Sequence, residues 1–421
     1  MSPPTRLAVV ATVLACAGAL FTTGTASAGT LTGDFYREPD TPAARWVAAN
    51  PNDSRTATIR DRIANQPASH WLSNFNLATI EAEVSSYVGA AATAGKLPVL
   101  TLYGIPNRDC GGASAGGAPD LTAYQNWVTL IARGLAGRST VIILEPDSIA
   151  LLTCLNASEI AARNQALHTA TTTLRAAGGK VYLDAGHSSW NSASEQANRL
   201  AAAGIADADG FYSNVSNFNS TANEAAFGRN VIAALNSRGI TGKRQVIDTS
   251  RNGGAAGDWC GDDNTDRRLG QAPTTATGDA NIDAYIWVKP PGEADGCRYA
   301  AGSFQPDLAF SLAGSPSSPP PDPSGSCAAT YQTTSAWNGG FQGQVTVTAG
   351  SAAIAGWRVT WTLTGGQSIG QVWGGRATTS GTTVTVANES WNGALRPGAT
   401  AQFGFVATGP VSTPAVSCVS G

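Results

Sequence analysis

Charge is scarce in this sequence. Only 13% of its 421 residues are charged, and 26 basic residues stand against 29 acidic ones, giving a formal net charge of −3. A protein that binds nucleic acid mainly through phosphates needs a surplus of Lys and Arg, so we expect no nucleic-acid partner. Hydrophobic residues make up 42% of the chain, which is enough to build cores and excludes disorder throughout.

Motifs for metal and nucleotide chemistry are also missing. There is no C-x-x-C pair, and the three histidines, His70, His168 and His187, are scattered, so we expect no metal site. Neither a P-loop nor a well-placed G-x-G-x-x-G is present, and no cofactor is expected. Ser/His/Asp catalysis is the weaker alternative, because we recognise no G-x-S-x-G nucleophile elbow.

The first residues predict a signal peptide. Arg6 precedes an apolar stretch at 7–21, and Ala26, Ser27 and Ala28 offer a small-x-small cleavage site. We assign 1–28 to this signal and expect a secreted, extracellular protein. No later segment reaches 18 consecutive apolar residues, so no membrane span is expected.

Six cysteines remain once Cys16 leaves with the signal. An even number in an oxidising compartment predicts disulfide bonds. Cys327 and Cys418 lie near the two ends of the C-terminal segment and would join them, whereas the other four belong to the larger segment, namely Cys110, Cys154, Cys260 and Cys297.

A linker separates two parts of different character. Residues 315–326 read SPSSPPPDPSGS, with five prolines and five serines, which favours an extended spacer. We therefore expect a catalytic domain at 29–314, the linker at 315–326 and a small domain at 327–421.

The larger part alternates strand and helix patterns. Apolar runs, which predict buried parallel strands, lie at 98–103, 140–145, 180–184, 245–249 and 284–288, with weaker candidates at 31–36 and 209–213. Asp120 is placed to begin one intervening helix, and Asn156 with Glu159 forms a capping-box spacing for another. About seven such units indicate an α/β barrel or a doubly wound sheet.

Acidic residues recur where these strands end, which is where the loops of an α/β barrel form an active site. They are Asp109, Glu145, Asp147, Asp184, Asp248, Glu293 and Asp295. An acid after a strand often caps the next helix, so each has an ordinary structural interpretation. Several acids converging with Trp190 and Trp259 instead favour glycosidic bond hydrolysis, which needs two carboxyl groups in different protonation states.

The motifs at these strand ends carry a resemblance. Tyr103-x-x-Pro-x-Arg-Asp-Cys, Glu145-Pro-Asp, Asp184-Ala-Gly-His, Asp248-Thr-Ser-Arg-Asn-Gly and Lys289-x-Pro-Gly-Glu-Ala-Asp-Gly are similar to those of the family-six glycoside hydrolases, which are cellulases. The resemblance covers about 31–313. It implies a distorted parallel β/α barrel that hydrolyses β-1,4-glucan with inversion, and disulfides Cys110–Cys154 and Cys260–Cys297.

Roles follow from the same resemblance. Asp147 corresponds to the general acid, Asp109 to the acid that supports it and Asp295 to the debated base, while Tyr103 and Asp184 lie beside the scissile sugar. A charge on Asp109 and partial burial would raise the pKa of Asp147. Which acid removes the proton of the attacking water stays open, because an ion pair with Lys289 or Arg251 would make Asp295 a poor base. Positions that match substrate contacts are Trp46, His187, Trp190, Asn217, Trp259, Lys289 and Glu293.

The tail predicts a small antiparallel β-sandwich. Its alternating runs are short, and it resembles the type-two carbohydrate-binding modules through its flanking cysteines and its tryptophans. Trp357 and Trp361 lie in an alternating strand and are expected in the core. Trp337, Trp373 and Trp391 are expected to form an exposed strip that binds cellulose.

We therefore expect a monomeric endo-acting β-1,4-glucanase. An exo-acting cellobiohydrolase is the first alternative, but the 38 residues from Cys260 through Cys297 leave little chain for a roof over the cleft. A catalytically inactive glucan-binding protein is the second alternative, and the presence of all the family acids disfavours it.

Overall fold

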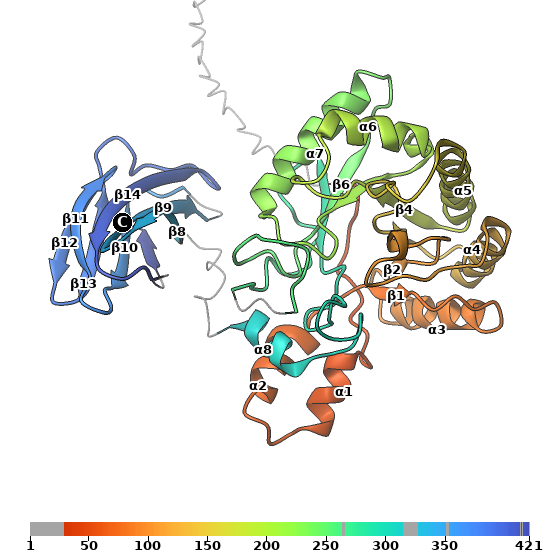
Figure 1. Ribbon diagram of the computed structural model, residues 1–421, viewed down its shortest axis with the longest axis horizontal. Coiled ribbons are helices and arrows are strands. Elements are labelled where there is room, and N and C mark those ends of the chain that lie inside the picture. The colour runs from red at the N-terminus through yellow and green to blue at the C-terminus, as the bar shows by residue number, and fades with distance from the viewer. Residues whose placement is uncertain are drawn as a thin grey trace, which may run out of the picture. The chain divides into compact units, whose positions relative to one another are not determined.

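The computed structural model describes residues 29–262, 266–314, 327–350, 353–412, 414 and 416–420. The expected signal peptide at 1–28 and linker at 315–326 lie outside the described residues. The chain divides into two compact units, Met1–Ala313 and Gly314–Gly421, each described by itself below (Figure 1). Within the described ranges, no helix is both long and apolar enough to cross a membrane.

The first unit is built on a seven-stranded sheet whose order follows the chain. Every neighbouring pair is parallel, and the strands are β1 (His70–Leu72), β2 (Val99–Leu102), β3 (Thr140–Leu144), β4 (Gly179–Asp184), β5 (Gly210–Ser213), β6 (Arg244–Asp248) and β7 (Ile282–Ile286). Parallel strands joined in sequence by right-handed crossovers curl the sheet toward a barrel. The expected α/β class and distorted barrel are confirmed.

Helices cover the outside of this curled sheet (Figure 1). They are α3 (Ile80–Thr93), α4 (Leu121–Leu135), α5 (Ala157–Ala176), α6 (Ala193–Ala202) and α7 (Thr221–Asn236). The Asp120 carboxylate accepts from the Ala123 amide at 2.8 Å and starts α4. Asn156 and Glu159 form the complete capping box that starts α5. Both helix starts agree with the sequence pattern.

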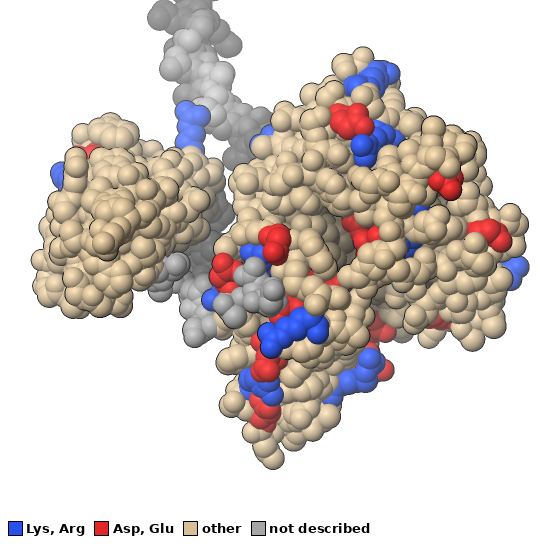
Figure 2. Space-filling model, in the orientation of Figure 1, with Lys and Arg blue, Asp and Glu red and all other residues tan. Residues whose placement is uncertain are grey.

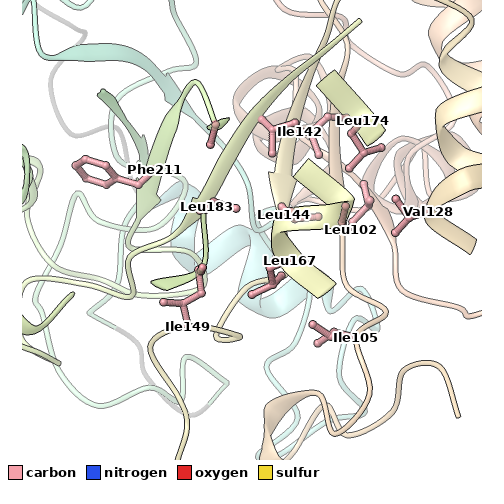
Figure 3. Packing of buried hydrophobic residues seen from close by; sticks show 14 of the residues in the cluster. Leu102, Ile105, Val128, Ile142, Leu144, Ile149, Leu167, Leu174, Leu183 and Phe211 are labelled. Atoms are coloured by element: carbon pink, nitrogen blue, oxygen red, sulfur yellow. The ribbon is translucent and has the colours of Figure 1, made fainter. Parts of the chain in front are cut away.

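Successive strand residues face two different cores. Leu102, Leu144 and Leu183 pack outward against helix residues such as Val128 and Leu167 (Figure 3). Their neighbours Val141, Ile143, Tyr182 and Tyr212 belong to a separate cluster inside the barrel. Because both faces are buried, the strands are apolar throughout, which is why sequence patterns find them.

One strand was not predicted. The three residues of β1 include His70 and Trp71 and form no apolar run. The weak candidate at 31–36 is instead wrong as a strand, since it makes a single bridge from Phe35 to Leu97. At the open seam, the Ser69 amide donates to the Trp287 carbonyl at 2.9 Å and the Trp71 indole to the Val288 carbonyl at 2.6 Å. These two bonds connect the two edges of the barrel.

Shorter helices complete the first unit. They are α1 (Pro42–Ala49), α2 (Thr56–Ile59), η1 (Arg60–Ala64), η2 (Asp109–Gly111), η3 (Ile205–Asp207) and α8 (Pro306–Ala313). Residues of α1, α2, η1 and α8 share a small apolar cluster of their own.

The second unit consists of two antiparallel four-stranded sheets, in the orders β12-β13-β10-β15 and β11-β14-β9-β8. The strands are β8 (Cys327–Trp337), β9 (Gly340–Ala349), β10 (Trp357–Thr362), β11 (Ser368–Trp373), β12 (Gly375–Ser380), β13 (Thr383–Asn388), β14 (Thr400–Thr408) and β15 (Ser417–Ser420). Trp357 and Trp361 are 2% and 3% exposed and stack against Phe403, as expected for core residues.

Three disulfides join Cys110 to Cys154, Cys260 to Cys297 and Cys327 to Cys418. The last closes the second unit across its two ends, as its boundaries suggest. The other two are the pairs that the family resemblance implies.

Candidate active site

A cavity of about 770 Å³ opens where the strands end. Its walls include Tyr103 after β2, Asp147 after β3, His187 after β4, Ser216 after β5 and Lys289 after β7. Carboxyl ends of parallel strands meet at one end of a barrel, so residues far apart in sequence converge there.

Strained backbone is concentrated at these loops. Among the described residues, eight that are not glycine have positive φ angles, and Ala136 is simply the C-cap of α4. The other seven follow β2, β3 or β5: Asn107, Asp109, Cys110, Glu145, Asp147, Asn214 and Ser216. Residues held in this conformation cluster at functional sites, where the surrounding structure fixes them.

Asp147 is the acid best suited to hold a proton. Its side chain is half-buried in the cavity wall, and its Oδ2 atom lies 3.4 Å from the Tyr103 hydroxyl. The pKa of Asp147 is raised to about 8, first by burial and then by the charges of Asp184 and Asp109. Asp147 is therefore protonated at neutral pH, as a general acid must be.

Asp109 is connected to Asp147 through two hydroxyl groups. The Ser114 amide and hydroxyl donate to Asp109 Oδ2 at 2.8 and 3.0 Å, and the Tyr103 hydroxyl lies 2.9 Å from the Ser114 hydroxyl. Asp109 remains half-buried and lines the cavity. The Asp109 carboxylate thus accepts two hydrogen bonds from Ser114, whereas the Asp147 carboxyl group faces the Tyr103 hydroxyl.

Asp184 lies behind the wall. It is 2% exposed and is absent from the cavity lining among the described residues, although the resemblance placed it beside the scissile sugar. Its carboxylate accepts from the amides of Ile149, Ala150 and Gly186 at 2.8–3.0 Å. It therefore holds the loop that carries Asp147 and acts on the acid through its charge.

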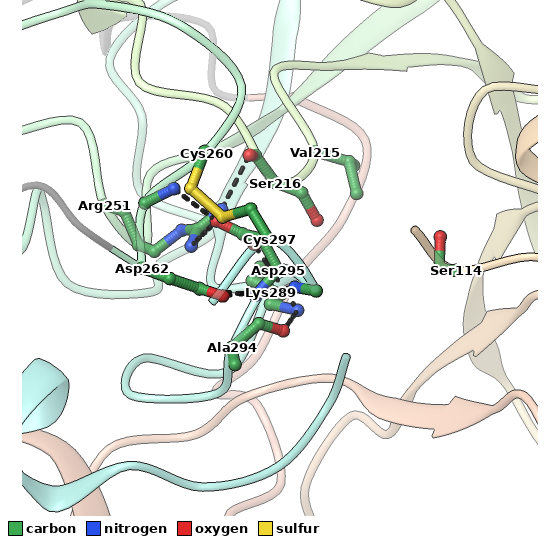
Figure 4. Close-up of polar contacts among 12 residues, drawn as sticks. Ser114, Val215, Ser216, Arg251, Cys260, Asp262, Lys289, Ala294, Asp295 and Cys297 are labelled. Atoms are coloured by element: carbon green, nitrogen blue, oxygen red, sulfur yellow. Dashed lines mark hydrogen bonds and ion pairs between the residues drawn. A yellow bond between two sulfur atoms is a disulfide. The ribbon is translucent and has the colours of Figure 1, made fainter. Parts of the chain in front are cut away.

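Asp295 is enclosed by cations and amides (Figure 4). Its Oδ2 atom accepts from Arg251 and from the Gly261 amide, both at 2.8 Å, while Oδ1 lies 3.6 Å from the Lys289 ammonium. Its side chain is 5% exposed. The sequence analysis named Arg251 and Lys289 as alternative ion-pair partners of Asp295. The structure shows that Asp295 pairs with both of them.

A neighbouring carboxylate fixes the Asp295 loop. Asp262 accepts from the backbone amides of Asp295, Gly296, Arg298 and Tyr299 at 2.7–3.3 Å. Asp262 also lies near Cys260 and Cys297, which by distance alone form a possible metal ligand set. Because the two sulfurs are bonded to each other and the carboxylate already binds amides, this cluster is structural.

Residues 30–318 match the family described as glycosyl hydrolases family 6, and residues 327–421 match the cellulose binding domain. The first match spans more than half of the chain. The chain belongs to glycosyl hydrolases family 6. Its second unit is a cellulose binding domain.

Members of family 6 align with this chain over most of its length. The chain is 46% identical over 441 residues to endoglucanase A of Thermobispora bispora, covering 95% of this chain and 96% of that protein. It is 42% identical to endoglucanase 1 of Streptomyces halstedii over 67% of this chain and 89% of that protein. Endoglucanase Cel6 of Mycobacterium tuberculosis, solved with a thio-linked cellobioside, has 40% identity and a TM-score of 0.62, covering 67% and 96% of the two chains.

Most of the expected family 6 sugar contacts line the cavity. They are His187, Trp190, Asn217, Trp259, Lys289 and Glu293. Burial lowers the pKa of His187 to about 4, so the imidazole is neutral at pH 7. Its Nδ1 atom accepts from the Ser189 amide at 3.2 Å, which leaves the proton on Nε2. Burial raises the pKa of Glu293 to about 7.

Trp46 is not part of that lining in the described residues. It packs on Phe304, with ring centroids 6.3 Å apart, and the Arg55 guanidinium lies 5.3 Å from its ring. Phe304 forms a bridge with Glu293, which does line the cavity, so Trp46 packs behind the lining, and its role as a sugar contact stays a prediction.

Two further lining residues escaped the sequence analysis. Trp71 lies on the unpredicted strand β1, and its ring packs edge-on against Tyr103 at 5.4 Å. Ser114 joins Tyr103 to Asp109. The sequence analysis was wrong to find no G-x-S-x-G, because residues 112–116 have this pattern around Ser114. The Ser114 hydroxyl donates to Asp109 from a loop between β2 and α4 and is not placed as an elbow nucleophile.

The three expected tryptophans of the binding domain are exposed. Trp337, Trp373 and Trp391 are 50%, 42% and 74% exposed, in contrast to the buried Trp357 and Trp361. Figure 2 shows that the face of this unit drawn there carries almost no charge. Exposed, flat apolar rings match the apolar faces of glucose units.

Proposed function

We propose that this family 6 chain is a secreted, monomeric endoglucanase that hydrolyses internal β-1,4 bonds of cellulose with inversion. The observation that carries the proposal is Asp147, a carboxylic acid with a pKa near 8, in the wall of a cavity that also presents Asp109 and three tryptophan rings. The three disulfides support secretion.

Asp147 supplies the proton in this mechanism. An inverting glycosidase protonates the leaving oxygen with one carboxyl group while a water attacks the opposite face of the sugar. Burial and the charges of Asp184 and Asp109 keep the proton on Asp147 until the glycosidic oxygen takes it. Tyr103, whose hydroxyl lies 3.4 Å from Asp147, orients the acid.

Asp109 is the proposed destination of the proton from water. Asp295 corresponds by motif to the base, but its two oxygens face Arg251 and the Gly261 amide on one side and Lys289 on the other. Asp109 lines the cavity, and among the described hydrogen bonds its carboxylate accepts only from Ser114. We propose that a water relay reaches Asp109, and that Asp295 stabilises charge at the reacting sugar.

Asp109→Asn should move the basic limb of the pH–rate profile toward lower pH. Removing the Asp109 charge lowers the pKa of Asp147, so the acid loses its proton earlier as pH rises. The rate at the optimum should fall as well. The measurement is kcat/KM against pH on a soluble cello-oligosaccharide, with the surface change Asp61→Asn as control. A basic limb that stays in place would remove this role from Asp109.

The endo mode predicts a rapid fall in the viscosity of carboxymethyl-cellulose before much reducing sugar appears. The rings of Trp190 and Trp259 are 37% and 54% exposed, as in an open cleft. The relatives of highest identity reported above are named endoglucanases, which supports the same mode. Accumulation of cellobiose at nearly constant viscosity would instead favour the exo-acting alternative.

A further inference from the structure

A buried arginine contacts the two loops that carry Asp109 and Asp147. Arg163, on α5, is only 4% exposed and faces the barrel. Its guanidinium donates to the Pro106 carbonyl at 2.8 Å, the Asn107 carbonyl at 3.3 Å and the Ser148 carbonyl at 3.5 Å. A planar guanidinium can hold several fixed acceptors at once, which an ammonium cannot do in the same way.

These carbonyls belong to different catalytic loops. Pro106 and Asn107 precede Asp109 in the loop after β2, whereas Ser148 follows Asp147 in the loop after β3. Glu145 links the same two loops by accepting hydrogen bonds from backbone amides, whereas Arg163 donates to backbone carbonyls. Its buried carboxylate accepts from the amides of Gly104 and Ile105 at 2.9–3.0 Å. The two side chains therefore hold the first loop by its carbonyls and its amides.

Both loops need external support. Asn107 and Asp109 have φ angles of 55°, and Glu145 and Asp147 have φ angles of 51° and 69°. Residues other than glycine persist in this region only where surrounding contacts determine their conformation. Without those contacts, the loops would relax and carry Asp109 and Asp147 with them.

Other anchors touch only the Asp147 loop. Asp184 accepts from the Ile149 and Ala150 amides, and Arg199 donates to the carbonyls of the same two residues. They orient Asp147 without reaching the Asp109 loop. The disulfide Cys110–Cys154 also joins the two loops, directly after Asp109 but well beyond Asp147. Arg163 joins the Asp109 loop to the residue directly after Asp147.

We propose that Arg163 is a positioning residue that fixes Asp109 relative to Asp147. This inference rests on the roles proposed above for the two acids. It predicts that loss of the guanidinium affects the chemical step more than sugar binding, because Trp190, Trp259 and Glu293 lie on other loops.

The test is Arg163→Lys in the full chain. It retains the positive charge beside Glu145 but cannot reproduce the bonds to three carbonyls. We expect kcat on a soluble cello-oligosaccharide to fall by about 10- to 100-fold, since a displacement of about 1 Å in an active site can cost a factor of this size. KM should change by less than about threefold. The matched control is Arg175→Lys on the exposed face of the same helix, which should keep the kcat of the unaltered protein.

The pH profile separates positioning from charge. If Asp109 moves away from Asp147, the basic limb of Arg163→Lys shifts to lower pH although the net charge is unchanged. An unaltered kcat and pH profile would overturn the inference, and so would a loss of sugar binding equal to the loss of kcat, which would show a general structural role. Asp147→Asn tests the proposed function separately: if that variant is inactive while Arg163→Lys behaves normally, only the role of Arg163 fails.

Discussion

Asp147→Asn will lower hydrolysis of cellulose and soluble cello-oligosaccharides by at least ~100-fold, the lower range of general acid contributions. The amide keeps the size of the side chain but has no proton to give to the leaving oxygen. Because the Asp147 side chain is half-buried and its carboxyl pKa is about 8, the neutral amide resembles the protonated acid that it replaces. The fold and sugar binding should therefore survive.

The control for this prediction is the leaving group. An aryl cellobioside whose phenolate departs without protonation needs no general acid for bond cleavage. Asp147→Asn should retain far more of its activity on that substrate than on cellulose. A correctly folded variant that still cleaves cellulose at the normal rate would contradict the assignment of Asp147 as the general acid.

Loss of the exposed tryptophans will abolish most adsorption to crystalline cellulose. Trp391→Ala removes the most exposed of the three rings, at 74%, so it should weaken adsorption without unfolding the domain. Deletion of 315–421 should abolish it and lower hydrolysis of crystalline cellulose, because the tether no longer keeps the catalytic domain near its substrate. Activity on soluble glucan should remain almost unchanged.

Trp357→Ala provides the contrasting variant. Its ring is 2% exposed, stacks on Phe403 and donates to the Asn392 carbonyl at 2.8 Å, so its loss should destabilise the domain by about 3–5 kcal/mol. The Cys327–Cys418 bond, which spans 91 residues, stabilises the domain by roughly 4–5 kcal/mol through its constraint on the unfolded chain, and it does so equally in the variant and in the unaltered protein. Adsorption isotherms and thermal unfolding together separate the two kinds of tryptophan. Normal adsorption by Trp391→Ala and by the truncated chain would show that the strip does not bind cellulose.

The strand ends could be predicted from sequence because buried parallel strands are continuous apolar runs. β2, β3 and β4 all appear as such runs, and the acids that follow them converge as the barrel requires. β1 escaped because three residues that include a histidine and a tryptophan carry no periodic signal. Trp71 was missed for the same reason.

The sequence motifs do not determine the direction in which each side chain points. Asp184 stands at a strand end like Asp147, yet three backbone amides draw its carboxylate behind the wall. The charge of Asp184 raises the pKa of Asp147 more than the charge of Asp109 does. The sequence analysis had named Asp109 as the main charge acting on Asp147. Trp46 likewise packs on Phe304 outside the cavity. Such contacts depend on the path of the loops, which local patterns do not encode.

The most direct test of the account is the anomeric configuration of the first product. Proton magnetic resonance during hydrolysis of a soluble cello-oligosaccharide distinguishes the α- and β-anomers before mutarotation mixes them. Direct attack of water opposite the bond protonated by Asp147 predicts that the α-anomer appears first. Initial release of the β-anomer would contradict it, because retention requires a covalent intermediate and a nucleophile that this site is not proposed to contain.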